Sequence, residues 1–148
     1  MQALYKLALA PVSETLADRN SYGFREGRSC ADAVAAAFNA LSKPNSATWV
    51  LEGDIKGCFD NISHEWMLKN IPMDRVILSI WLKSGYVEDG ITYPSRKGTP
   101  QGGIISPTLS NLVLDGLEST VHGTVPRRSR VNFVRYADDC VSRRQTLL

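Results

Sequence analysis

Acidic residues at the ends of two predicted strands constrain this chain more than any other feature. Asp54 ends a predicted strand over residues 48–55, which is rich in β-branched and aromatic side chains. Asp138 and Asp139 directly follow a second predicted strand over residues 131–136. Acidic residues are poor strand formers, and carboxylates that cluster repel one another. An ordinary turn would explain the Asp138-Asp139 pair by itself, whereas a divalent cation would remove the cost of gathering all three carboxylates.

Apolar residues at helical spacing predict several helices around these strands. The first covers residues 29–41, with Ser29 as its cap. Shorter helices are expected after Ser63 and after Asp74, and a further one begins at Ser106, because proline at the next position favours a helix start. From the first helix, the side chains expected to face the core are Cys30, Ala33, Val34, Ala37, Phe38 and Leu41. From the helix after Asp74, they are Val76, Ile77, Ile80 and Trp81.

The remaining segments are predicted as connections and one short strand. Residues 56–61 are expected to form a turn, residues 91–93 a strand, and residues 96–103 a glycine-rich loop. The resulting order of helix, strand, helices, helix and strand suits an α+β domain, in which helices pack on a small antiparallel sheet.

Composition excludes several classes of protein. The 148 residues suffice for one domain, and 43% apolar with 22% charged residues is the range of soluble globular proteins. No stretch reaches the ~20 apolar residues that span a bilayer, and the N-terminus lacks the pattern of a secretory signal, so a cytoplasmic protein is expected. Three distant cysteines without a Cys-x-x-Cys motif argue against structural zinc and disulfides, and predict buried free thiols.

Charge points only weakly to a partner. The net charge of +2 is too small to indicate nucleic acid by itself. From Val121 onward, however, six arginines stand against two acids, Asp138 and Asp139. This basic segment would either contact phosphates or form a solvated surface, and charge alone does not separate the two.

Four motifs in a fixed order carry a family resemblance. Residues 133–139 contain Tyr-Ala-Asp-Asp, which resembles the Tyr-x-Asp-Asp box of reverse transcriptases. Residues 54–62 resemble the block with the third catalytic aspartate, residues 98–107 the loop and helix between them, and residues 21–29 an upstream fingers block. The amino-acid sequences of these motifs are most similar to those of proteins encoded by group II introns, and the resemblance spans residues 2–140. Retron and diversity-generating reverse transcriptases rank lower as alternatives.

The resemblance implies a fold and its boundaries. It implies a truncated α+β reverse transcriptase domain of the fingers–palm type, with fingers over residues 1–47 and palm over residues 48–148. The thumb and the maturase region that follow in this family are expected to be absent.

The resemblance also implies a metal site. Asp54 and Asp138 would ligate the metal ions, with help from the backbone carbonyl of Ile55, and Asp139 would support the site from beside it. The implied cofactor is a pair of Mg²⁺ ions, with Mn²⁺ as an alternative. Two such ions about 4 Å apart can activate an attacking hydroxyl and stabilise a leaving oxygen.

Three further residues would bind the incoming nucleotide. Phe59 matches the aromatic steric gate that excludes a 2′-hydroxyl, although a core phenylalanine would have the same pattern. Gln101 matches the glutamine that contacts the nucleotide, and Gly102 would allow close approach of the backbone. An ordinary Gly-Pro turn is the alternative for this loop.

Three other residues would contact the primer and template. Tyr136 would lie near the primer end, and otherwise is an exposed strand tyrosine. Arg25 and Arg28 would face nucleic acid, and otherwise are surface arginines.

The chain also departs from the family pattern. The block that grips the triphosphate is absent from its start, and Glu26 replaces the usual proline. The Asp138-Asp139 pair should lie in a β-hairpin, but residues 142–146 lack the apolar alternation of a second strand. A decayed or frame-shifted intron gene product, or a fragment of one, would explain this loss of pattern.

The implied activity is RNA-directed DNA polymerisation linked to intron splicing and mobility. A primer 3′-hydroxyl would attack the α-phosphate of a deoxynucleotide. The implied partners are an RNA template, a DNA primer, deoxynucleoside triphosphates and group II intron RNA. A non-catalytic RNA-binding maturase remnant and an inert fragment remain as alternatives.

Overall fold

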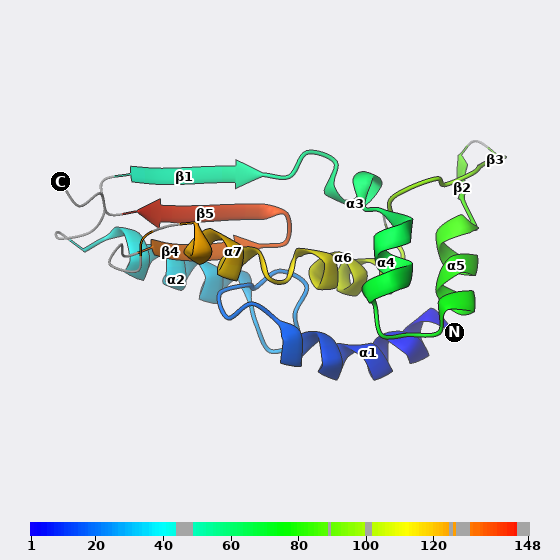
Figure 1. Ribbon diagram of the computed structural model, residues 1–148, viewed down its shortest axis with the longest axis horizontal. Helices are drawn as coiled ribbons and strands as arrows, with labels where there is room; N and C mark the ends of the chain where they lie inside the picture. The colour runs from blue at the N-terminus through cyan, green and yellow to red at the C-terminus, as the bar shows by residue number, and fades with distance from the viewer. Residues whose placement is uncertain (44–48, 89, 100–101, 125, 127–130, 145–148) are drawn as a thin grey trace. The chain divides into compact units, whose positions relative to one another are not determined.

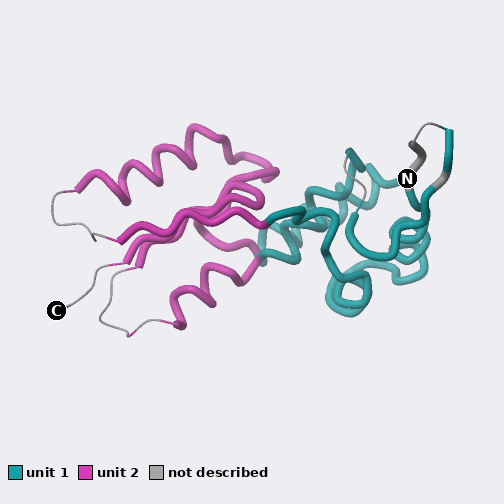
Figure 2. Tube along the Cα trace, turned by 90° about the horizontal axis from the view of Figure 1, so that it is seen from above, with its two compact units in different colours: residues 1–16, 56–114 teal, residues 17–55, 115–148 magenta. Residues whose placement is uncertain are grey.

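The computed structural model describes residues 1–148 apart from 44–48, 89, 100–101, 125, 127–130 and 145–148. It divides into two compact units, and each is assembled from two separate segments of chain (Figures 1 and 2). Unit 1 comprises residues 1–16 and 56–114, and unit 2 comprises residues 17–55 and 115–148. Helices together with a three-stranded antiparallel sheet confirm the predicted α+β class. The units do not follow the predicted boundary at residues 47–48, so the division into fingers and palm stays a prediction.

Unit 1 is a group of helices with one short hairpin. Its elements are α1 (Gln2–Leu16), α3 (Cys58–Asn61), α4 (His64–Asn70), α5 (Arg75–Lys83), α6 (Ser106–Leu114), β2 (Tyr86–Glu88) and β3 (Ile91–Tyr93). Apolar side chains from α1, α4, α5 and α6 meet in one core. The buried members are Leu9, Ile62, Met67, Ile71, Leu78, Leu82, Ile105, Leu109 and Leu112. Burial of this apolar surface is the main stabilising term for the unit.

The start of α5 agrees with the prediction from the sequence, but its buried face differs from the predicted one. Asp74 caps α5 by accepting hydrogen bonds from two amides of its first turn, as predicted. The expected buried residues Val76 and Ile80 are 67% and 58% exposed, whereas Leu78 and Leu82 face the core. Both pairs are apolar and four residues apart, so periodicity could not decide which pair faces inward.

Unit 2 is a three-stranded sheet between two helices. The strands are β1 (Trp49–Asp54), β4 (Val131–Tyr136) and β5 (Asp139–Arg144), in the order β1-β5-β4 with antiparallel neighbours (Figure 1). The helices α2 (Cys30–Leu41) and α7 (Leu117–Gly123) lie on opposite faces of this sheet (Figure 2).

The helix α2 begins as predicted but packs through a different face. Ser29 and Asp32 form a capping box, in which each side chain accepts a hydrogen bond from the other residue's backbone amide. Of the predicted apolar stripe only Ala33 is buried, and Phe38 is 67% exposed. The helix approaches β4 with its small alanine side chains, so the larger apolar side chains lie outside the contact.

The strand β5 corrects the expectation that the pattern ends after Val141. It is the central strand and runs through Arg144, paired on both edges. Its polar residues are accommodated because the buried Arg143 guanidinium donates to the main-chain carbonyl of Ala40 in α2. A strand whose main chain is paired on both edges does not need a continuous apolar face.

Several other expectations need correction. Residues 56–61 contain the short helix α3 rather than a turn alone, and α1, β2 and α7 were not predicted. The three cysteines are free, as expected, but only Cys58 is buried, since Cys140 is half-buried and Cys30 exposed. None of the helices among the described residues is long and apolar enough to cross a membrane.

Candidate active site

Two of the three predicted catalytic aspartates stand side by side at one end of the sheet in unit 2. Asp54, the last residue of β1, is directly opposite Asp139, the first residue of β5. Asp139 is also directly opposite Tyr136, the last residue of β4. Residues directly opposite one another in an antiparallel sheet project from the same face, with Cβ atoms about 5 Å apart. The three side chains therefore form a row across the sheet.

The third aspartate, Asp138, lies in the turn that joins β4 to β5. Its main-chain carbonyl accepts a hydrogen bond from the amide of Ile55 at 3.3 Å, which ties the turn to the end of β1. Asp54 and Asp139 are exposed, and Asp138 is half-exposed. The arrangement thus presents three carboxylates at one solvent-facing edge, while the predicted role of the Ile55 carbonyl stays a prediction.

These carboxylates are suited to a hard cation. Within the described part of the chain, no hydrogen bond or ion pair engages the side chains of Asp54, Asp138 or Asp139. The described residues also hold no group of three or more His, Cys, Asp or Glu side chains that could enclose a metal ion. Mg²⁺ is usually held by one or two carboxylates together with water and substrate phosphates, rather than by a closed protein cage. An open pair with a third carboxylate in the adjacent turn fits that mode of binding.

The turn itself has an uncommon backbone. Ala137 has φ of 56°, in the left-handed region, which costs a residue with a Cβ roughly 1–2 kcal/mol. Arg135 holds this conformation from one side, because its Nη1 donates to the Ala137 carbonyl at 2.9 Å. Gly23 abuts it from another side, since a Cβ at Gly23 would lie 2.3 Å from the Ala137 nitrogen. The residue before Asp138 is therefore held tightly.

A buried charge cluster lies beside this turn. Arg25 and Arg135 both donate through Nη2 to Oδ1 of Asp115, and both arginine side chains have no exposed surface. Burial raises the pKa of the Asp115 carboxyl, and the two guanidiniums oppose that rise. The prediction that Arg25 faces nucleic acid is not supported, because its guanidinium is in the interior and is paired with Asp115.

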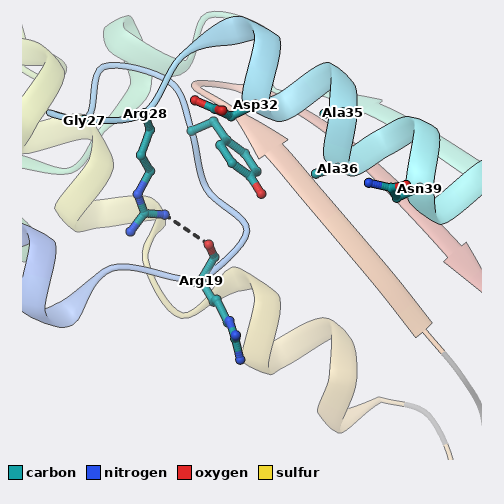
Figure 3. A pocket seen from close by; sticks show the side chains of 8 residues that line it. Arg19, Gly27, Arg28, Asp32, Ala35, Ala36 and Asn39 are labelled. Atoms are coloured by element: carbon teal, nitrogen blue, oxygen red, sulfur yellow. Dashed lines mark hydrogen bonds between the residues drawn. The ribbon is translucent and has the colours of Figure 1, made fainter.

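The second predicted nucleic-acid contact, Arg28, lines a surface pocket of unit 2 (Figure 3). Its Nη1 donates to the main-chain carbonyls of Asp18, Arg19 and Ser21, at 3.2, 3.0 and 2.6 Å. The pocket encloses about 500 Å³ and is lined by Arg19, Tyr22, Gly27, Arg28, Asp32, Ala35, Ala36 and Asn39. Arg28 thus supports the local main chain, and its contact with nucleic acid stays a prediction.

The predicted nucleotide-binding residues belong to unit 1. Phe59 is half-buried in α3, and its carbonyl accepts a hydrogen bond from the amide of Thr99 at 2.7 Å. Gly98 has φ of 83°, and a Cβ there would lie 2.5 Å from the Phe59 carbonyl oxygen. The loop that leads to Gln101 is therefore packed directly on α3. Gln101 itself lies outside the described residues, and Gly102 is exposed with φ of 84°.

Sequence reasoning missed several supporting residues. His64 was assigned no role, yet its Nε2 donates to the Gly98 carbonyl at 2.7 Å and so fixes the loop beside Phe59. Asp115 and Arg135 were also missed as a pair. Their one local signal was an acid placed directly after the apolar run Leu112–Leu114, which does not reveal a partner twenty positions away.

Comparison with known proteins finds a family model and several relatives that match most of the chain. The family model described as "Reverse transcriptase (RNA-dependent DNA polymerase)" matches residues 1–144. The group II intron-encoded protein LtrA of Lactococcus lactis subsp. cremoris is 37% identical over 128 residues, which cover 82% of this chain and 21% of that protein. An uncharacterised 91 kDa protein in the cob intron of Schizosaccharomyces pombe is 35% identical over 127 residues, 82% of this chain and 15% of that protein.

A solved structure supports the fold. Telomerase from Candida albicans, in complex with the TWJ fragment of telomeric RNA, matches with a TM-score of 0.56 and 13% identity. The match covers 95% of this chain and 29% of that one. At this identity the likeness concerns the fold alone. The chain thus spans about a fifth of LtrA and less than a third of the telomerase chain.

Proposed function

Because the chain belongs to the reverse transcriptase family, we propose that it provides the metal-binding face of an RNA-directed DNA polymerase of the group II intron type. The observation that carries this proposal is the register of the sheet. Asp54 opposes Asp139, and Asp138 lies in the adjoining turn, so two exposed carboxylates and one half-exposed carboxylate lie at one edge of the sheet.

Different residues of the chain would have different roles in nucleotidyl transfer. Asp54 and Asp138 would hold two Mg²⁺ ions, and Asp139 would add negative charge beside them. When bound, such ions stabilise charge on the transferred phosphate and lower the pKa of the attacking primer hydroxyl. Tyr136, in the same row as Asp54 and Asp139, would contact the primer end. The protein's own contribution is then mainly positioning.

A second set of residues would select the substrate. Phe59 would pack against the sugar of the incoming deoxynucleoside triphosphate and exclude a 2′-hydroxyl, and Gln101 and Gly102 would contact the same nucleotide. The main-chain bond from Thr99 to Phe59 supports this grouping, because it keeps the aromatic ring and the loop before Gln101 together. An RNA template and a DNA primer would be the nucleic-acid partners, and group II intron RNA the specific target.

Primer extension on an RNA template tests the polymerase proposal directly. The purified chain is given Mg²⁺ and deoxynucleotides and compared with Asp138→Ala, with circular dichroism to confirm that both are folded. Extension that falls by at least about a hundredfold in Asp138→Ala supports a working metal site. Equal extension by the two proteins would show that the activity does not use these carboxylates.

Intron RNA binding without catalysis is a second candidate. The similarity to LtrA, a group II intron-encoded protein, supports intron RNA binding as well as polymerisation. Filter binding of group II intron RNA to the native chain and to Asp54→Ala separates the two functions. Tight RNA binding that survives this substitution, in a protein without primer extension, would favour the binding function.

A further inference from the structure

We propose that Arg135, Asp115 and Gly23 act as positioning residues that set the backbone of the turn and so aim the carboxylate of Asp138. The inference rests on the proposed function, because it assigns to that metal site a support that lies inside unit 2. Gly23 and Arg135 lie within two of the sequence motifs, but the motifs do not connect these residues with each other or with Asp115, which lies outside all four.

The first step concerns the side of the sheet from which Arg135 acts. Tyr136 and Asp139 are paired and share the face that carries Asp54. Side chains alternate along a strand, so Arg135 projects from the opposite face. Its guanidinium is buried there and reaches Asp115 at 3.0 Å and the Ala137 carbonyl at 2.9 Å. Arg135 therefore supports the turn from beneath the row of aspartates.

The second step concerns what holds Asp115. The Asp115 carboxylate accepts a hydrogen bond from Nη2 of Arg25. The Nε of Arg25 also donates to the Ser21 hydroxyl at 3.1 Å. The neighbouring chain is fixed as well, because the Asp18 carboxylate accepts hydrogen bonds from the amides of Gly116 and Glu118 at 3.0 and 3.1 Å. Asp115 is thus an anchored acceptor, and Arg135 is a rigid link between it and the turn.

The third step concerns the segment that runs along the outer edge of β4. The Arg135 amide donates to the Asn20 carbonyl at 2.8 Å, and the Tyr22 amide donates to the Arg135 carbonyl at 2.9 Å. These two bonds bring Gly23 against the main chain of Ala137. A side chain at position 23 would collide with backbone atoms, which cannot give way as the end of a flexible side chain can.

The fourth step connects this support to the metal ligands. The carbonyls of both turn residues accept hydrogen bonds, that of Ala137 from Arg135 and that of Asp138 from Ile55. The turn has little freedom left, so the Asp138 side chain leaves it in a defined direction. Mg²⁺ requires near-ideal ligand geometry, and residues that orient its ligands commonly change affinity by about 10- to 100-fold when replaced.

A matched pair of substitutions separates positioning from stability. Arg25→Met and Arg135→Met each remove one buried guanidinium from the same Asp115 oxygen, and the bond to Ala137 belongs to Arg135. Arg135→Lys is added because it keeps the charge, so that the test still stands if the methionine variant does not fold. Gly23→Ala disturbs the turn from the other side and leaves the charges at Asp115 in place.

Two measurements are made on the full 148-residue chain and each variant. Amide hydrogen exchange over the turn reports its order without any metal. Titration with Mn²⁺, followed by its electron paramagnetic resonance signal, reports affinity at the carboxylates, with Asp138→Ala as the reference for a lost site. We expect faster exchange and about tenfold weaker Mn²⁺ binding for Arg135→Lys and Gly23→Ala, and a smaller change in both quantities for Arg25→Met, which keeps the bond from Arg135 to the Ala137 carbonyl.

The outcomes separate this inference from the proposed function. Equal exchange at the turn in the native chain, Arg135→Lys and Gly23→Ala would overturn the positioning role. If the Arg25 and Arg135 variants lost equal amounts of Mn²⁺ affinity and of protection from exchange at the turn, the positioning role would also be overturned. The cluster would then contribute to stability alone. Faster exchange in the two turn variants, with no Mn²⁺ binding by the native chain, would keep the role in shaping the turn and count against the metal site.

Discussion

The two units bury different chemistry. Unit 1 encloses a cluster of apolar side chains, with Met67 and Leu78 fully inaccessible. Unit 2 encloses two arginines that meet one aspartate, and its largest fully buried side chain is Arg135. Apolar contacts are non-directional and tolerate adjustment, whereas hydrogen bonds to a guanidinium have fixed directions.

This difference indicates what each interior does. The apolar core of unit 1 provides stability and a scaffold for α3 and its loop. The charged interior of unit 2 is a weak source of net stability, because desolvation offsets much of the attraction. It does specify one arrangement of three chain segments beside the turn with Asp138. The predictions that follow test this contrast.

The largest expected effect comes from removing the shared acceptor in unit 2. Asp115→Ala would leave two buried guanidiniums without their carboxylate, and we expect a loss of about 4 kcal/mol in the free energy of unfolding. Urea unfolding measures the loss, and hydrogen exchange assigns it to unit 2. A loss of stability confined to unit 1 would contradict the contrast between the two interiors. Asp115→Asn is the control, because it keeps the shape of the side chain and removes its charge.

A second prediction concerns the apolar interior of unit 1. Leu78→Ala removes a fully buried side chain from the core, and we expect a loss of about 3 kcal/mol. Ile80→Ala on the exposed face of the same helix should change stability by no more than about 0.5 kcal/mol. Thermal unfolding of both variants gives the difference. Similar losses would mean that the helix α5 buries the face originally predicted from the sequence.

A third, smaller effect concerns the start of α2. Ser29→Ala removes the cap of this helix, and we expect a loss of about 1 kcal/mol. Ser63→Ala at the cap of α4 is its counterpart in unit 1 and should cost a similar amount. Urea titrations of the two variants compare local contacts across the units. A much larger loss for one of them would show that its helix carries more of its unit's stability than the cap alone.

The smallest expected effect is a pH dependence of the same capping box. The pKa of Asp32 is lowered by hydrogen bonds from the Ser29 side chain and backbone. Its folded pKa is below the unfolded value, so the contribution to stability is present at neutral pH and is lost as pH falls through the folded pKa. The stability gap between the native chain and Asp32→Asn should therefore shrink on acidification. A gap that is constant with pH would exclude this contribution.

Local features of this fold could be predicted from sequence, and features that depend on distant partners could not. The caps Ser29, Ser63 and Asp74 were correct, because a cap interacts with amides two or three residues away. The choice between the two apolar faces of α5 depended on the position of the core, which local periodicity does not contain. The continuation of β5 beyond Val141 was missed for the same reason, since partners on both edges stabilise it.

The candidate site divides in the same way. The positions of Asp54 at the end of β1 and of the Asp138-Asp139 pair directly after β4 were correctly predicted, because both strands could be recognised from their own residues. The roles assigned to these residues remain predictions. The interior placement of Arg25 was missed, since a buried arginine has the same sequence pattern as an exposed one until its partner Asp115 is known.

The pairing of β1 with β5 has a consequence for the order of folding. Residues 131–144 form a hairpin from neighbouring strands, which closes a short loop, whereas β1 must find β5 across all of residues 55–138. Contacts between distant positions form slowly, because closing a long loop costs entropy before any contact compensates for it. We therefore expect the Asp138-Asp139 hairpin to form early and Asp54 to join it late. Assembly of the three carboxylates would then be a kinetic marker of completed folding, readable as the moment when a refolding chain first binds Mn²⁺.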